Sequence, residues 1–173
     1  MTFSYPTLTT DRLILRAPTA ADVDPWMAFL TSDRGTWHGA GPKEGAGRAW
    51  RAVATLLGHW QIHGFGPFVA RLKSDNTPVA SVGAFFPDDW PERELGWSVW
   101  RDTDEGKGYA VEAARAVIRH YFEDLRWDSL VSYIDPANER SVALAERLGA
   151  QRDDAAKRTH PEDLVYRHPK GLA

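Results

Sequence analysis

The feature that most constrains the fold is a predicted strand, a glycine-containing turn and an amphipathic helix in direct succession over residues 94–125. Residues 94–100 have the apolar character of a strand, and Gly106 and Gly108 lie in the turn that follows. The helix then carries one apolar face, formed by Ala110, Ala114, Val117, Ile118, Tyr121 and Leu125. The chain therefore passes from a strand end directly into a helix N-terminus.

Such a junction is a candidate anion site. The first N–H groups of a helix have no partner within it, and the helix dipole places partial positive charge there. Gly106 and Gly108 remove the Cβ atoms that would keep a diphosphate from the backbone, and Lys107 either adds charge or points to water. The same glycines also suit an ordinary turn. Val111 replaces the third glycine of the dinucleotide fingerprint, and the P-loop spacing is absent.

The rest of the chain predicts an α+β domain. Further strands are expected at residues 12–17, 68–72, 79–86, 130–134, 150–152 and 164–167. Further helices are expected at residues 20–32, 50–63 and 139–148, with a glycine-rich loop over 35–47. This order indicates one mainly antiparallel sheet of six to seven strands with about four helices on its faces. We expect a single domain over residues 1–173, since no repeat or linker is evident.

Composition narrows the function. The 173 residues contain no cysteine, which excludes a disulfide framework and a cysteine nucleophile. A net charge of −3, with no basic block, gives no reason to expect nucleic acid as a partner. No apolar run is long enough to span a membrane, and no signal pattern opens the chain, so we expect a cytoplasmic protein. The six histidines form no metal pattern; His59 and His63 are expected on a helix surface.

Here the sequence resembles a known family. Residues 105–110, Glu-Gly-Lys-Gly-Tyr-Ala after a strand, are similar to the acyl-CoA pyrophosphate loop of the GCN5-related N-acetyltransferases (GNAT). Residues 10–16 resemble the opening strand of the ribosomal-protein-type (RimJ/RimL-like) branch. Residues 138–149 resemble its Asn-x-x-Ser helix, and residues 164–169 its closing strand. The matches occur in the right order over about residues 8–169, which makes them more specific together than singly.

The resemblance implies a GNAT-like sheet whose central strands splay apart and acetyl-CoA as co-substrate, with no metal. It implies that the splayed strand, at Ser98, Val99 and Trp100, offers free backbone groups to pantetheine. It implies that pyrophosphate lies on the loop amides of Glu105, Gly106, Lys107, Gly108, Tyr109 and Ala110. Asn138 would meet the pantetheine or thioester from the other side. Glu105 departs from the Gln, Arg or Trp common at its position, and an acid there weakens CoA binding unless backbone amides dominate.

Two residues are candidates for catalysis. Glu94 begins the splayed strand, where a half-buried carboxylate can have the raised pKa that suits a base for the amine. The alternatives are a surface carboxylate paired with Arg93, or Glu92 as the base. Ser141 is the candidate donor to the leaving sulfur, or else only a first-turn helix residue. Ala145 stands where many family members carry a tyrosine general acid.

The acceptor pocket is expected near Trp37, His38 and Trp90, because in similar proteins the segment between the first two helices borders it; ordinary packing is the alternative for each ring. The leading hypothesis is an N-acetyltransferase that acts on a protein N-terminus or a small amine. A second is a non-catalytic acyl-CoA-binding module on the same fold. A third, a nucleotide-binding or phosphoryl-transfer protein, lacks the expected motifs. Many relatives form homodimers, and nothing in the sequence decides this.

Overall fold

A computed structural model describes residues 5–171. One eight-stranded sheet runs in the order β1-β2-β3-β4-β5-β6-β8-β7. The strands are β1 (Thr7–Thr9), β2 (Leu13–Arg16), β3 (Pro67–Leu72), β4 (Pro78–Phe85), β5 (Glu94–Val99), β6 (Val131–Ile134), β7 (Gln151–Arg152) and β8 (Leu164–Arg167). The α-helices are α1 (Val23–Thr31), α2 (Gly45–His63), α3 (Tyr109–Arg119) and α4 (Glu139–Arg147). Short helical turns are η1 (Ala20–Asp22), η2 (Asp33–His38), η3 (Asp102–Asp104) and η4 (His120–Asp124), the last a π-helix.

The sheet is antiparallel except at its centre, where β5 and β6 are parallel and paired only at Glu94 and Val131. Beyond this pair the two strands separate, which confirms the expected splay. The three-residue strand β1, which pairs with β2, adds to the six to seven strands expected. Three residues are too few for a period-two pattern to be recognised, so the sequence did not indicate β1.

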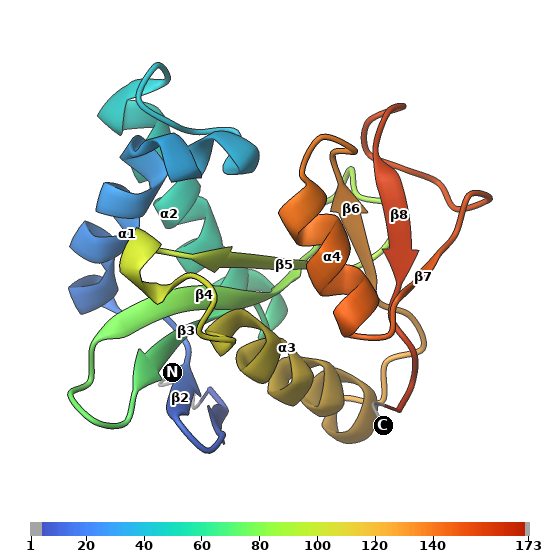
Figure 1. The fold of residues 1–173 in the computed structure, drawn as a ribbon, viewed down its shortest axis with the longest axis horizontal. Helices are drawn as coiled ribbons and strands as arrows, with labels where there is room; N and C mark the ends of the chain where they lie inside the picture. The colour runs from blue at the N-terminus through green and yellow to red at the C-terminus, as the bar shows by residue number, and fades with distance from the viewer. Residues whose placement is uncertain (1–4, 172–173) are drawn as a thin grey trace.

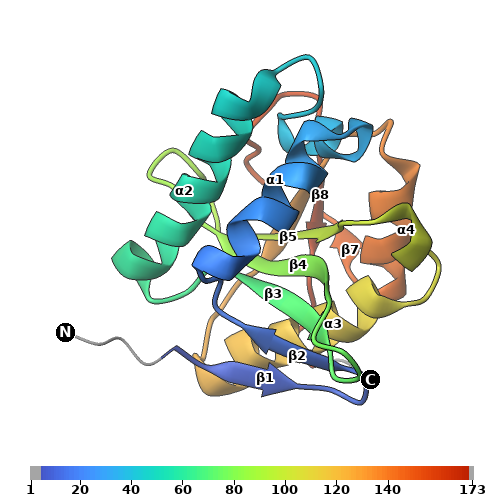
Figure 2. The same ribbon diagram turned by 90° about the vertical axis from the view of Figure 1, so that its left-hand side faces the viewer.

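The helices cover both faces of the sheet, as Figures 1 and 2 show. Side chains of α1 and α2 pack with Val69 and Trp100 in one apolar cluster. Side chains of α3 pack with Phe68 and Ala70 in another. Because successive residues of a strand point to opposite faces, β3 contributes to both clusters. None of the helices within residues 5–171 is both long and apolar enough to cross a membrane.

The segment after α1 differs from the sequence-based expectation of a loop over residues 35–47. Residues 33–38 form the 3₁₀ turn η2, and α2 already begins at Gly45. Glycines oppose helix formation in isolation, but Ala49 and Val53 are buried against α1, and this packing outweighs the local preference. The structure thereby fixes η2, which carries Arg34, Trp37 and His38, close to the end of β5.

Candidate active site

The backbone of β5 is open on the side of the splay. The N–H of Trp100 donates to the carbonyl of Val79 on β4. Because backbone groups alternate along a strand, those of Trp97 and Val99 then face the gap toward β6. The carbonyl of Leu95 already accepts a hydrogen bond from Ser132 Oγ at 2.7 Å. The carbonyl of Val99 is also occupied, because Arg34 Nε and Nη2 donate to it at 3.1 and 2.8 Å. The open groups are therefore the backbone of Trp97 and the N–H of Val99. Ser98 and Trp100 face β4, which corrects the expectation of free backbone groups there.

The loop before α3 contains backbone N–H groups that have no hydrogen-bond partner within residues 5–171. Gly106 and Gly108 have φ values of +73° and +79°, a backbone conformation that favours glycine. Among the residues that the structure describes, the N–H groups of residues 106–110 donate to no protein acceptor. The N–H of Glu105 instead donates to the carbonyl of Asp102. Contrary to the expectation from the sequence, this amide is therefore not available to an anion. The candidate anion site thus begins at Gly106.

Side chains from outside and within the loop bind its backbone and its charges. Arg12 donates to the carbonyl of Lys107 at 2.9 Å and binds the carboxylate of Glu112, in the first turn of α3, at 2.6 Å. The ammonium of Lys107 pairs with Asp104, whose carboxylate is buried. Burial opposes ionisation of Asp104, but hydrogen bonds from Arg101 and Lys107 hold its pKa below the ordinary value. The charge of Lys107 is therefore compensated at Asp104.

The carboxylate of Glu105 points to two arginines. Its Oε1 atom lies 2.7 Å from Arg140 Nη1 and 2.8 Å from Arg34 Nη1. Arg34 also binds Asp102, at 2.6 Å. The acid beside the candidate anion site is thus paired with cations from η2 and α4.

A first cavity of about 590 Å³, here called the α4 cleft, lies between this loop, β5 and α4. Its lining includes Arg34, Trp97, Ser98, Val99, Glu105, Ala110, Asn138, Arg140 and Ser141. Asn138 caps α4, its Oδ1 accepting from the N–H of Ser141. The hydroxyl of Ser141 accepts a hydrogen bond from Trp97 Nε1 at 3.2 Å, which leaves its own proton free to donate into the cleft.

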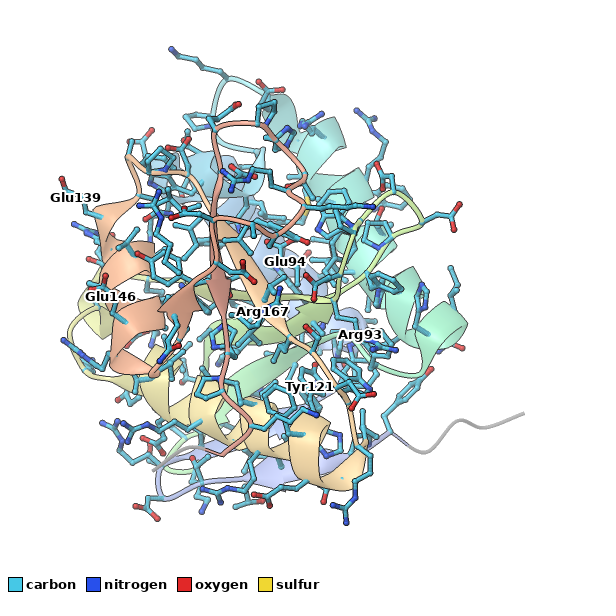
Figure 3. The ribbon with its side chains drawn as sticks, turned by 90° about the vertical axis from the view of Figure 1, so that its right-hand side faces the viewer. Arg93, Glu94, Tyr121, Glu139, Glu146 and Arg167 are labelled. Atoms are coloured by element: carbon cyan, nitrogen blue, oxygen red, sulfur yellow. The ribbon has the colours of Figure 1, made fainter. Side chains whose placement is uncertain are left out.

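A second cavity of about 610 Å³, here called the Glu94 cleft, lies on the other side of Trp97. Its lining includes the aromatic rings of Phe29, Trp37, Phe85, Trp90, Trp97 and Tyr133, and the carboxylates of Glu94, Asp135 and Asp163. Figure 3 views this side of the molecule, with Glu94 labelled near its centre and Glu139 and Glu146 marking α4. The predicted acceptor residues Trp37, His38 and Trp90 all line this cleft.

Glu94 has the environment of a base. Its Oε2 atom accepts a hydrogen bond from Trp90 Nε1 at 2.6 Å, and no cation within residues 5–171 forms an ion pair with it. Burial raises the pKa of Glu94 to about 7. The hydrogen bond from Trp90 and the charge of His160 act against this rise, and the negative charge of Asp163 adds to it. The suggested partner Arg93 instead lies over the ring of Trp127. Its guanidinium carbon is 4.5 Å from that ring centre.

Glu92, considered as an alternative base, serves another purpose. Its two carboxylate oxygens accept hydrogen bonds from Arg167 at 2.8 and 3.0 Å, and Ser129 also donates to it. The hydrogen bond from Arg167 is the main cause that holds the pKa of Glu92 below its ordinary value. A carboxylate so engaged is a poor proton acceptor near neutral pH.

The two clefts meet. Phe29, Trp37, His38, Trp97 and Ser98 line both of them. The ring of His38 packs edge-on against Phe29, with ring centres 5.3 Å apart, and the ring of Trp37 is 52% exposed. Trp97 therefore stands between one cavity beside bare amides and another that contains a carboxylate of raised pKa. Two molecules bound in these cavities would touch at Trp97.

Three site residues were not found from the sequence: Arg34, Arg140 and Asp163. Asp163 lines the Glu94 cleft, is 8% exposed and accepts a hydrogen bond from Thr159 Oγ1 at 2.9 Å. The one local signal concerns Arg140, which stands in the first turn of α4, where cations are unfavourable. Arg34 and Asp163 gain their roles only from contacts between distant segments.

The histidine pair on α2 also differs from expectation. His59 is buried rather than on the surface, with its Nε2 accepting from the N–H of Phe86 and its Nδ1 2.8 Å from the carbonyl of Phe65. Burial lowers the pKa of His59, so the neutral ring links α2 to the sheet. In the described part of the chain, no group of three or more potential ligands forms a metal site.

Comparison with known proteins identifies relatives for this arrangement. Residues 12–151 match the model of the acetyltransferase (GNAT) domain family. The crystal structure of an acetyltransferase from Agrobacterium tumefaciens C58 is 38% identical and covers 98% of this chain and 97% of its own, with a TM-score of 0.87. The ribosomal-protein-S5-alanine acetyltransferase of Vibrio fischeri shares the fold, with 15% identity, coverage of 94% and 95%, and a TM-score of 0.68.

A curated relative is YnaD of Bacillus subtilis (strain 168), described as an N-acetyltransferase. It is 29% identical over 69 residues, which are 40% of this chain and 40% of that protein. The chain covers only 36% of the length of YkkB of Bacillus subtilis (strain 168) and 40% of the length of YnaD.

Proposed function

Because the chain belongs to the GNAT acetyltransferase family, we propose that it transfers the acetyl group of acetyl-CoA to a primary amine, by direct attack in a ternary complex. The observation that carries this proposal is the row of unpaired amides at residues 106–110 beside the open backbone of Trp97 and the N–H of Val99. The meeting of the two cavities at Trp97 supports a ternary complex, since both substrates must be in contact for the transfer.

The residues of the α4 cleft fit acetyl-CoA. The amides of residues 106–110 suit its diphosphate. Gly106 and Gly108, whose positive φ favours glycine, place no Cβ in its way. The backbone of Trp97 and the N–H of Val99 suit the pantetheine amides, with Asn138 on the opposite wall. When bound, acetyl-CoA would supply an activated thioester at the junction of the clefts. Lys107 is not assigned to the diphosphate, because its charge is compensated by Asp104.

Glu94 is the proposed base. A pKa of about 7 leaves a substantial fraction of its side chain ionised at neutral pH, so it can accept the proton that an ammonium must lose before attack. The new C–N bond then forms as the C–S bond breaks. The hydroxyl of Ser141 is the proposed donor to the leaving sulfur, and Trp97 orients it.

We also propose that the acceptor is a small amine with a second positive charge. The carboxylates of Glu94 and Asp163 face one cavity, and within the described residues neither has a cation as ion-pair partner. Arg48 and His160 line the same cavity, but within residues 5–171 neither forms an ion pair with Glu94 or Asp163. A second cation on the substrate would therefore offset the charge of Asp163 while Glu94 takes the proton. A volume of about 610 Å³ lies in the range of small-molecule sites.

The test is a binding and turnover experiment on the purified protein. Calorimetry should show CoA binding, and thiol release from acetyl-CoA should rise with diamines more than with monoamines of equal length. Absence of CoA binding would refute the donor assignment. CoA binding without turnover on any amine of a broad panel would instead favour a non-catalytic acyl-CoA-binding module.

A further inference from the structure

Three charged side chains from three separate elements meet across the α4 cleft. Arg34 belongs to η2, Glu105 to the loop before α3, and Arg140 to the first turn of α4. Glu105 Oε1 lies 2.8 Å from Arg34 Nη1 and 2.7 Å from Arg140 Nη1. Since the N–H of Glu105 is already bonded to Asp102, residue 105 acts at this site through its side chain.

The two arginines are held very differently. The side chain of Arg34 is 19% exposed, and its Nε and Nη2 atoms donate to the carbonyl of Val99 at 3.1 and 2.8 Å. The side chain of Arg140 is 81% exposed, and Glu105 is its one partner within residues 5–171. Exposed ion pairs contribute little to stability, so Arg140 can exchange its partner at small cost. Arg34 is fixed, and Arg140 is free to move.

The position of Arg140 in its helix is unfavourable unless an anion is near. Asn138 caps α4, so Arg140 lies in the first turn, close to the positive end of the helix dipole. Glu105 offsets this in the free protein. A diphosphate on the amides of residues 106–110 would do so better, because it carries more charge and can bind a guanidinium with two oxygens.

We propose that Arg140 is a cofactor-binding residue that Glu105 holds in place: its guanidinium leaves the Glu105 carboxylate and pairs with the diphosphate when acetyl-CoA binds. Arg34, which also pairs with Asp102, stays paired with Glu105. This inference rests on the proposed function, because it takes acetyl-CoA as the ligand of the α4 cleft. It explains how an acid can occupy the first position of a diphosphate loop.

The experiment compares dissociation constants, measured by calorimetry, for Arg140→Gln and for the control Arg147→Gln. Arg147 is an exposed arginine in the last turn of the same helix. Arg140→Gln should weaken binding of CoA and of dephospho-CoA about tenfold or more, as expected for one lost charge-assisted contact. It should leave binding of S-acetylpantetheine, which has no diphosphate, unchanged. Arg147→Gln should bind all three ligands as the wild type does.

The same substitution in a Glu105→Gln protein separates two possible roles of Arg140, binding the diphosphate and neutralising Glu105. Glu105→Gln removes the competing carboxylate, and Arg140→Gln should still weaken CoA binding in that background. A loss that disappears there would show that Arg140 only neutralises Glu105, which overturns the inference. An effect confined to CoA and absent with dephospho-CoA would overturn the assignment to the diphosphate. Unchanged CoA binding by Arg140→Gln refutes this inference alone, whereas a wild-type protein that binds no CoA refutes the proposed function as well.

Discussion

Replacing Glu94 with glutamine should have opposite effects on activity and stability. Burial raises the pKa of this carboxylate from 4.5 to about 7, so the folded protein resists its ionisation. Between these values the folded state binds more protons than the unfolded state, and the stability of the wild type therefore falls as the pH rises from about 4.5 to 7. A glutamine, which does not ionise, escapes this cost.

The size of the effect follows from the two pKa values. The gap between about 7 and 4.5 corresponds to about 3 kcal/mol, the upper limit of the stability gained by Glu94→Gln at pH 8. At pH 4 both states of the wild type are largely protonated, and the gain should nearly vanish. Activity should change in the other direction, since losing a general base lowers kcat by about 100- to 10,000-fold.

Urea unfolding at pH 4 and pH 8, together with the pH dependence of kcat/KM, tests both effects. For the wild type, kcat/KM should rise about tenfold between pH 6 and pH 8, as Glu94 goes from about one-tenth to about nine-tenths ionised. CoA binding by the variant serves as the control and should be unchanged. The reasoning is refuted if the variant keeps the activity of the wild type, or if its stability gain is the same at both pH values.

Three further substitutions test other parts of the site. Gly108→Ala should lower the free energy of unfolding by about 1–2 kcal/mol and weaken CoA binding, because φ is +79° at this position. Thermal melts measure the first effect and calorimetry the second, and unchanged CoA binding would contradict the assignment of this loop to the diphosphate. Glu92→Gln should lower the free energy of unfolding at pH 7 by about 1–2 kcal/mol through loss of the pair with Arg167, and leave kcat unchanged. Because the pKa of Glu92 lies below 4.5, the stability that it contributes is present above pH 4.5 and is lost as the pH falls through the folded value, so the variant and the wild type should converge in acid. Asp163→Asn should lower kcat/KM about tenfold for diamines and little for monoamines; equal losses for both would argue against a second cation site.

Local patterns were enough to find the loop and its strand. The glycines at 106 and 108, the strand before them and the apolar face of α3 are all features of neighbouring residues, and the structure places them as expected. The splayed pair of central strands followed from the family resemblance, and the pairing of β5 with β6 at Glu94 alone confirms it. The order of strands is likewise close to expectation, apart from the short β1.

Features of the site that depend on strand register or on contacts between distant segments could not be predicted from the sequence. Whether the N–H of Trp100 faces the gap depends on the register between β4 and β5, and a shift of one residue reverses the answer. Glu105 looked unfavourable because the arginines that neutralise it lie far away in sequence, one before and one after it. His59 looked like a surface residue because the partners of its two ring nitrogens come from after α2 and from after β4.

The single backbone pairing between β5 and β6 leaves the sheet in two parts, one of five strands and one of three. With so little main-chain bonding across the junction, the amides along the gap should exchange with deuterium faster than those in the middle of either part. A pantetheine chain in the gap would act as a substitute strand. Cofactor binding should then slow exchange on both sides at once and make the two parts unfold as one cooperative unit.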